Sequence, residues 1–328
     1  MTGSAGVRGV WTVFGAMALA GTAAFAWGSL VERRMFTLRH ETVPVLPKGA
    51  ASVTILHLSD LHMAPWQHDK QDWVRSLARL KPDLIVDTGD NLGHEDGIPG
   101  IERAFADFGG IPGLYVHGSN DYYGPKHKNW LKYFTGPSSA DPGRKKRKPH
   151  ERNLDTARLD AFFTDALGWQ NLNNAVGTVT IKNTRFDVFG VDDPHIGADR
   201  LDLLTGLLDS QQDDESLDST DAGLQRVVHI GVVHAPYQRA LNSFVNHGAD
   251  LILAGHTHGG QVCIPRYGAL VTNCDIPRSQ VKGLSLWRHA LRSAFLHVSA
   301  GLGTSIYAPV RFACRPEATL LTLVAREK

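Results

Sequence analysis

Five short apolar runs along the chain each end in a cluster of histidine, aspartate or asparagine, and this repetition constrains the fold more than any other feature. The runs have the length of buried strands, and the clusters fall in turns that contain glycine or proline. Because strand ends on one side of a sheet converge, the clusters are expected to share one pocket. The pairs of run and cluster are 53–58 with Asp60 and His62, 84–86 with Asp90 and Asn91, 114–116 with Ser119, Asn120 and Asp121, 227–233 with His234, and 251–254 with His256 and His258.

The segments around these runs predict an α/β domain in which two sheets pack together with helices outside them. Apolar residues recur at helical spacing over 66–80 and 101–108, and the first of these patterns stops at Pro82. Strand–helix alternation early in the chain and hairpin-like strands later favour mixed sheets. Further strands are predicted at 179–181, 186–191, 295–298 and 319–324.

The N-terminal part of the chain contains a long segment without charge. Its 23 residues, 9–31, would span about 34 Å as a helix, enough for a bilayer core of about 30 Å. We expect a membrane anchor; an export signal cleaved after Ala24-Phe25-Ala26 and a buried soluble helix stay open as alternatives. Arg33 and Arg34 follow the segment and favour a cytoplasmic position for the catalytic part.

The rest of the chain is predicted to form one catalytic domain. Residues 40–51 include two prolines and a Lys-Gly pair and predict a short linker, so that the anchor or signal with its linker covers 1–51 and the domain covers 52–328. Two polar segments, 135–152 with its basic run 144–148 and 210–223, are predicted as solvated surface loops. In an anchored protein the basic run would lie near anionic head groups.

Charge and cysteine content exclude several classes of protein. The net charge of +1 gives no case for a nucleic-acid partner. The three cysteines argue against a disulfide framework, although one bridge with one free thiol stays open. None of them forms a Cys-x-x-Cys pair, so a thiolate zinc site is not expected.

The polar clusters together supply more metal ligands than one ion can use. Three carboxylate or amide oxygens and four imidazoles exceed the four ligands of a zinc site. The set suits two metals bridged by a carboxylate, and mixed nitrogen and oxygen ligands without thiolate favour Mn, Fe, Zn or Co over Ca or Mg. Two metals about 3.5–4 Å apart are typical of enzymes that cleave phosphoesters.

These motifs resemble the series found in the calcineurin-like metallophosphoesterases. The matching motifs are Asp60-x-His62, Gly89-Asp90, Gly118-Ser-Asn-Asp121, His234 and Gly255-His256-x-His258. The ending 255–261 with Pro265 is similar to that of the bacterial subgroup with an N-terminal membrane or export segment. The resemblance covers 53 to the C-terminus. It implies a four-layer α/β/β/α sandwich of two mixed sheets, and a phosphomonoesterase or phosphodiesterase that uses a hydroxide bridging two divalent transition metals at the strand C-terminal ends.

The resemblance also implies a role for each matching residue. Asp60, His62 and His258 would bind the first metal, Asp90 would bridge, and His234 and His256 would bind the second. The family has Asn and then His where this chain has Ser119 and Asn120. We expect Asn120 to supply the amide ligand, with Ser119 or a water as the alternative, so that Asp90, Asn120 and His234 are the catalytic candidates. The family histidine near the leaving group is missing, and its replacement is sought among His94, Asp121 and His195.

Two other functions stay open on the sequence alone. A metal-binding protein with weakened or lost catalysis would explain Ser119 and Asn120. A mononuclear iron oxygenase needs only three of the ligands and leaves the other clusters unexplained. The fold and the metal ligands indicate a reaction class and not a substrate, but an anchored hydrolase favours a lipid- or envelope-linked phosphoester. Tyr122, Tyr123 and Trp130 are predicted either to line the substrate or to pack in the core.

Overall fold

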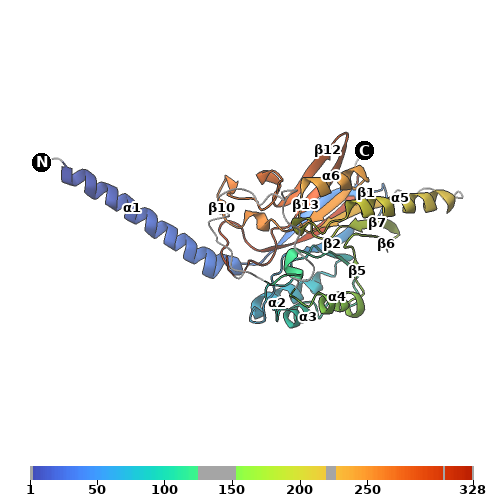
Figure 1. Ribbon diagram of the computed structural model, residues 1–328, viewed down its shortest axis with the longest axis horizontal. Coiled ribbons are helices and arrows are strands. Elements are labelled where there is room, and N and C mark those ends of the chain that lie inside the picture. Colours follow the sequence, from blue (N-terminus) through green and yellow to red (C-terminus); the bar gives the residue numbers. More distant parts are fainter. Residues whose placement is uncertain (1–2, 125–152, 219–226, 306, 327–328) are drawn as a thin grey trace.

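Two six-stranded mixed sheets form the centre of the domain in the computed structural model, which describes residues 3–124, 153–218, 227–305 and 307–326 (Figure 1). The first sheet has the strand order β1 (Thr37–Leu46), β14 (Glu317–Ala325), β2 (Val53–Leu58), β3 (Leu84–Asp87), β4 (Gly113–Tyr115) and β5 (Gln170–Asn171). The second has the order β12 (Gly283–His289), β13 (Arg292–Val298), β9 (Leu251–Ala254), β8 (Val228–Val233), β7 (Thr184–Gly190) and β6 (Ala175–Ile181).

The sheets pack on one another and are covered by helices, which confirms the four-layer sandwich. Ile55 and Val86 of the first sheet share a buried cluster with Val188, Ile230 and Leu253 of the second. The outer face of the first sheet packs on α2 (His68–Ser76), α3 (Ile98–Ala104) and α4 (Thr156–Ala161), and that of the second on α5 (Leu201–Asp218) and α6 (Gln238–Asn246). Because most central strands are buried on both faces, their sequences are continuous apolar runs.

The parallel strands end level with one another, and this places the polar clusters together. In the first sheet β2, β3 and β4 run parallel, with Leu58 beside Asp87 and Asp87 beside Tyr115. In the second sheet β8 and β9 run parallel, with Val233 beside Ala254. The chain therefore leaves all five strands at one edge of the sandwich, as ligand sites in open α/β sheets require.

The predicted linker is wrong over 40–46, because these residues belong to the ten-residue strand β1. This strand pairs in parallel with β14, and Val43, Val45 and Leu46 are fully buried. Pro44 suggested a break, but a proline lacks only the amide donor, and β1 is an edge strand where that donor is dispensable.

The predicted acidic loop 210–223 is also partly wrong. Residues up to Asp218 continue α5, an 18-residue helix, and residues 219–223 lie outside the described residues. Glu and Gln are good helix formers, so polarity alone did not indicate a loop here. The basic run 144–148 lies outside the described residues as well.

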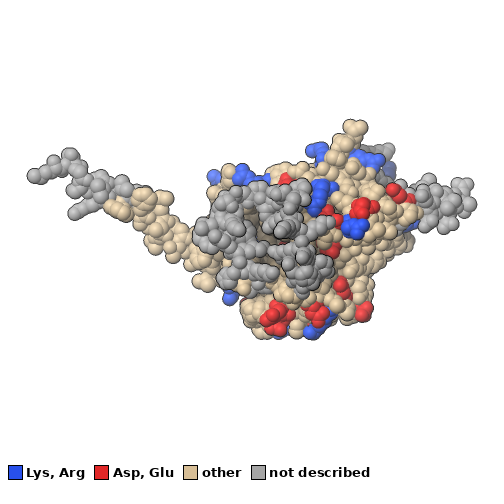
Figure 2. Space-filling model, in the orientation of Figure 1, with Lys and Arg blue, Asp and Glu red and all other residues tan. Residues whose placement is uncertain are grey.

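The N-terminal helix α1 (Gly3–Ala26) extends away from the sandwich (Figure 1). With the turns that follow it, residues Phe14–Arg34 are long and apolar enough to cross a membrane, and only 6% of the most apolar stretch is buried. In Figure 2 the described part of α1 that is visible has no charged side chains. This exposure excludes a buried core helix and leaves the anchor and the signal as interpretations.

The base of this helix is fixed to the domain through one buried carboxylate. Glu32 accepts hydrogen bonds from the amides of Ala313 and Cys314 at 3.1 and 2.7 Å and from Trp27 Nε1 at 3.0 Å. The Gly28 carbonyl accepts a further bond from the Arg311 amide at 3.2 Å. The helix therefore leaves the domain at a defined place.

Candidate metal centre

The seven predicted ligands come together at the edge where the parallel strands end. Asp60 and His62 follow β2, Asp90 follows β3, Asn120 follows β4, His234 follows β8, and His256 and His258 follow β9. Five of them have left-handed backbone angles: Asp60, His62, Asp90, His256 and His258, with φ from 42° to 68°. Such angles are uncommon outside glycine and concentrate at functional sites, where surrounding structure holds them in place.

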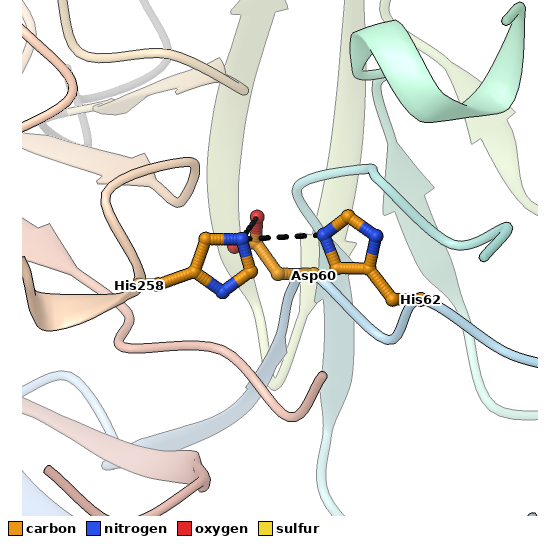
Figure 3. Close-up of side chains that lie close together, drawn as sticks. All are labelled: Asp60, His62 and His258. Atoms are coloured by element: carbon orange, nitrogen blue, oxygen red, sulfur yellow. Dashed lines mark hydrogen bonds and ion pairs between the residues drawn. The ribbon is translucent and has the colours of Figure 1, made fainter. Parts of the chain in front are cut away.

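Asp60, His62 and His258 form a first group (Figure 3). His258 Nε2 lies 3.5 Å from Asp60 Oδ1 and 3.2 Å from His62 Nε2. Ser59 Oγ and the His256 amide donate to Asp60 Oδ2, whereas the buried Asp60 Oδ1 has no hydrogen-bond partner among the described residues. Burial raises the pKa of Asp60 to about 6 and lowers that of His62 to about 4, so the imidazole is neutral and its nitrogen can act as a ligand.

Asp90, His234 and His256 form a second group beside the first. His234 Nε2 lies 3.5 Å from Asp90 Oδ2 and 3.3 Å from His256 Nδ1. Asp90 Oδ2 also lies 3.5 Å from His62 Nε2, so this one oxygen lies between the two groups. Asp60, Asp90 and His234 each offer one ligand atom, and these three atoms lie within 4.8 Å of one another.

Backbone carbonyls orient the two imidazoles of the second group. His234 Nδ1 lies 2.7 Å from the Thr88 carbonyl oxygen, and His256 Nε2 lies 3.0 Å from that of Asn273. A carbonyl can only accept, so His234 donates from Nδ1 and its Nε2 faces the site. Burial lowers the pKa of His234, but the charges of Asp90, Asp193 and Asp60 outweigh it and raise the pKa well above its usual value, so this ring holds a second proton that a metal would displace. His256 Nε2 also lies 3.1 Å from Asn273 Nδ2, and its Nδ1 faces the site. Such outer contacts are typical of histidines that bind metals.

Asn120 is the residue of the Ser119–Asn120 pair whose side chain faces Asp90. Its Nδ2 donates to Asp90 Oδ2 at 2.6 Å and its backbone amide donates to Asp90 Oδ1 at 2.8 Å. Rotating the amide by half a turn would point its oxygen, which can bind a metal, at the same place.

The three candidate acids have different surroundings. The carboxylate of Asp121 is fully buried and accepts four backbone hydrogen bonds, so it fastens two loops together. His94 packs against Trp66 with ring centroids 5.1 Å apart and lies 3.6 Å from Asp96. Of these three, His195 is the one whose side chain is described against the side chain of a predicted ligand: its ring centroid is 4.5 Å from that of His256, and its Nδ1 is 3.0 Å from the Tyr237 hydroxyl.

Tyr122 and Tyr123 are core residues for the most part. Each is 4% exposed, and the Tyr122 hydroxyl donates to Asp192 Oδ1 at 3.0 Å. Trp130, the third predicted aromatic, lies outside the described residues.

Sequence reasoning missed two residues that lie close to the ligands. Arg311 is fully buried, donates to the carbonyls of Ala300, Gly301 and Gly303, and lies 3.3 Å from His258 Nδ1. A Cβ atom at Gly301 would lie 2.6 Å from Asp60 Cβ, so this loop must pass close beneath the site. The Gly-Leu-Gly sequence after the strand 295–298 was the available signal.

Asp193 is the second missed residue. It is fully buried, its Oδ1 accepts from the His195 amide, and its Oδ2 has no hydrogen-bond partner among the described residues. Burial, opposed by the charge of His234 and reinforced by that of Asp90, raises its pKa to about 8. Its only signal in the sequence was its place in an Asp-Asp-Pro turn.

The chain is similar to several known proteins. The family model for calcineurin-like phosphoesterases matches residues 53–260. The chain is 26% identical over 329 residues to the "uncharacterized metallophosphoesterase YkuE" of Bacillus subtilis, covering 97% of this chain and 96% of that protein. It is 27% identical over 300 residues to the bovine "transmembrane protein with metallophosphoesterase domain", covering 86% and 56% of the two chains. A 5'-nucleotidase precursor from Thermus thermophilus is among the similar solved structures, with a TM-score of 0.42, 12% identity, and 83% and 55% of the two chains covered.

Proposed function

This chain belongs to the calcineurin-like phosphoesterase family and is a hydrolase of phosphoric esters, and we propose that its converging side chains hold two divalent transition metals. The observation that carries the proposal is the position of Asp90 Oδ2, 3.5 Å from His62 Nε2 and 3.5 Å from His234 Nε2. A single oxygen shared by two groups of imidazoles is what a bridging ligand requires.

The donor atoms fit this pair of metals. Asp60 Oδ1 is buried without a partner among the described residues, and two pairs of imidazole nitrogens face each other at 3.2 and 3.3 Å. A metal bound there would displace any proton shared between the paired nitrogens and accept both lone pairs. The first metal would take Asp60, His62 and His258, the second His234, His256 and Asn120, and Asp90 would bridge. Nitrogen and oxygen ligands without thiolate favour Mn, Fe or Zn.

When bound, two such metals lower the pKa of a water and hold the phosphate oxygens. The side chains of the protein would orient the metal ligands and donate a proton to the leaving group. Thr88 and Asn273 hold the rings of His234 and His256 in orientation. We assign His195 to proton donation towards the leaving oxygen, because it packs on His256 and its Nδ1 is engaged by Tyr237. General-acid help of this kind is worth about 10²–10⁴-fold.

A position at the membrane would favour one class of phosphoester substrate. If α1 anchors the chain, the site works beside a bilayer, and a lipid- or envelope-linked phosphoester is the proposed substrate class. The basic pair Arg33–Arg34 favours a cytoplasmic position for the domain.

The test uses the full chain in detergent, depleted of metal by a chelator and then reloaded with Mn²⁺. Bis-p-nitrophenyl phosphate and p-nitrophenyl phosphate separate diesterase from monoesterase activity, and elemental analysis counts the bound metals. We expect two metals per chain and turnover that is lost in an Asp90→Ala control. One metal per chain would refute the dinuclear centre.

A second candidate function rests on the Ser119–Asn120 pair. A chain that binds two metals yet turns over no faster than its Asp90→Ala variant is a metal-binding protein that has lost efficient catalysis. Metal content and turnover, measured on the same sample, separate this outcome from the hydrolase.

A further inference from the structure

A small hairpin directly after the metal-binding turn exposes large apolar side chains. It is formed by β10 (Cys263–Ile264) and β11 (Gly268–Ala269), which pair in antiparallel fashion. Ile264 is 48% exposed, Tyr267 60% and Leu270 38%. Arg266 is exposed between them, and we call these four residues the hairpin face.

The hairpin face lies next to the base of α1. Val262 forms a bridge with Phe312, and the Cys263 amide donates to the Phe312 carbonyl at 2.8 Å. The residues on either side of Phe312 hold the helix base: the Arg311 amide donates to Gly28, and the Ala313 amide donates to Glu32. Figure 1 accordingly shows β10 close to the end of α1 that joins the domain.

Further exposed apolar and aromatic side chains lie near the hairpin face and the base of α1. Trp27 and Leu30 at the helix base are exposed, as is Tyr307 in the loop that leads to Arg311. Arg278 lies over the Tyr267 ring at 4.8 Å and donates to its hydroxyl at 2.8 Å. Tryptophan and tyrosine mixed with arginine at the end of an apolar helix are typical of the level of lipid head groups.

We propose that the hairpin face rests on the bilayer surface, so that the domain is held against the membrane at two places, α1 and the hairpin. Apolar side chains would enter the boundary between head groups and acyl chains, and Arg266 and Arg278 would meet anionic head groups. This inference rests on the membrane span by α1 and on no step of the hydrolysis.

The contact has a consequence for the substrate class of the proposed hydrolase. The segment 262–273 leaves the turn that carries His258 and returns to His256, whose Nε2 contacts the Asn273 carbonyl at 3.0 Å. A hairpin lying on the bilayer therefore brings both histidines near head-group height. The substrate class that fits is a phosphoester in the head group of a membrane amphiphile.

Site-directed fluorescence in vesicles tests the contact on the full chain. A bimane label is attached to Ile264→Cys, to Leu19→Cys in α1, or to Leu291→Cys at the turn between β12 and β13, which lie away from α1 in Figure 1. The native cysteines are buried, and the unsubstituted chain measures their background labelling. The vesicles contain phosphatidylcholine and phosphatidylglycerol, with or without brominated acyl chains as quencher.

We expect quenching at positions 19 and 264, at least about twofold above that at position 291. Quenching at 19 with position 264 no different from 291 would mean that the helix spans while the hairpin stays in water, which overturns the proposal. No quenching at 19 would remove the span and the proposal with it. Hydrolysis of bis-p-nitrophenyl phosphate in detergent reports on the proposed function separately, because it needs no bilayer.

A triple variant, Ile264→Ser, Tyr267→Ser and Leu270→Ser, tests the consequence for substrates. We expect an unchanged rate on the soluble ester and a rate several-fold lower on p-nitrophenyl hexadecyl phosphate embedded in the same vesicles. Equal rates of variant and parent on the embedded ester would refute the positioning role of the hairpin face.

Discussion

Replacing Asp121 by asparagine distinguishes a structural carboxylate from a catalytic acid. Asp121 Oδ1 accepts from the amides of Asn91 and Leu92 at 2.7 and 3.2 Å, and Oδ2 accepts from those of Asp90 and Gly118 at 2.8 and 2.9 Å. The carboxylate thus joins the loop after β3 to the loop after β4. An asparagine keeps one acceptor oxygen and turns its NH₂ group towards two amide donors.

Two buried amides therefore lose their acceptor in Asp121→Asn. Each such loss costs about 1–3 kcal/mol, which gives a decrease of roughly 2–6 kcal/mol in the free energy of unfolding. Chemical unfolding of the full chain in detergent, followed by tryptophan fluorescence, measures it. Asp96→Asn is the matched control, because the Asp96 side chain is 75% exposed, and its effect is expected to stay within about 0.5 kcal/mol.

The opposite outcome would refute the structural role. If Asp121→Asn unfolds like the parent chain but slows only the esters with poor leaving groups, then Asp121 donates a proton during the reaction. The assay compares p-nitrophenyl with phenyl esters under the same metal load, since only the phenyl ester needs strong help to leave.

Three further predictions concern the site and its surroundings. Asp90→Ala removes the oxygen shared by both groups, so hydrolysis is expected to fall at least about 100-fold with loss of bound metal, measured by steady-state kinetics and elemental analysis. Ser119→Asn combined with Asn120→His restores the family pair, and in a chain that also carries His195→Gln it is expected to recover about 10²–10⁴-fold in kcat for phenyl esters with little effect on p-nitrophenyl esters; equal gains for both would contradict the role given to that histidine. Burial lowers the pKa of His117, but Asp121 and Asp160 outweigh it and raise the pKa to about 10. Its contribution to stability is therefore complete below about pH 6.5 and is lost as the pH rises through 10. Unfolding at pH 7 and pH 10 should show a smaller difference in His117→Gln than in the parent chain.

The central strands and the place of the candidate site could be predicted from one pattern, an apolar run followed directly by polar residues. A strand buried on two faces must be apolar throughout, and a polar group directly after it lies at the sheet edge. From this signal the sequence predicts that Asp60, Asp90, His234 and His256 share one edge of the sandwich, and the fold brings them together there. This signal depends on neighbouring residues in the sequence, so it does not predict contacts between residues that are far apart in the chain.

The residues that prediction missed depend on distant partners. Arg311 carries no motif, and only the fold brings its guanidinium to the carbonyls of Ala300, Gly301 and Gly303 beside His258. The strand β1 was not predicted because Pro44 suggested a break. A proline is tolerated in an edge strand, and the sequence does not show which strand lies at the edge of the sheet. Ser119 and Asn120 likewise stayed alternatives, since their orientation depends on the turn that Asp121 holds.

The strand β1 also determines where the chain can be shortened. A version that begins at residue 52, to free the enzyme from its apolar helix, would strip β14 of its neighbour along nine residues. The exposed backbone groups of β14 could then pair with other copies of the chain. The resulting aggregation would be misinterpreted as an effect of losing the membrane anchor. Cutting near Met35 removes the helix and keeps the edge covered, although Glu32 then no longer caps the amides of Ala313 and Cys314.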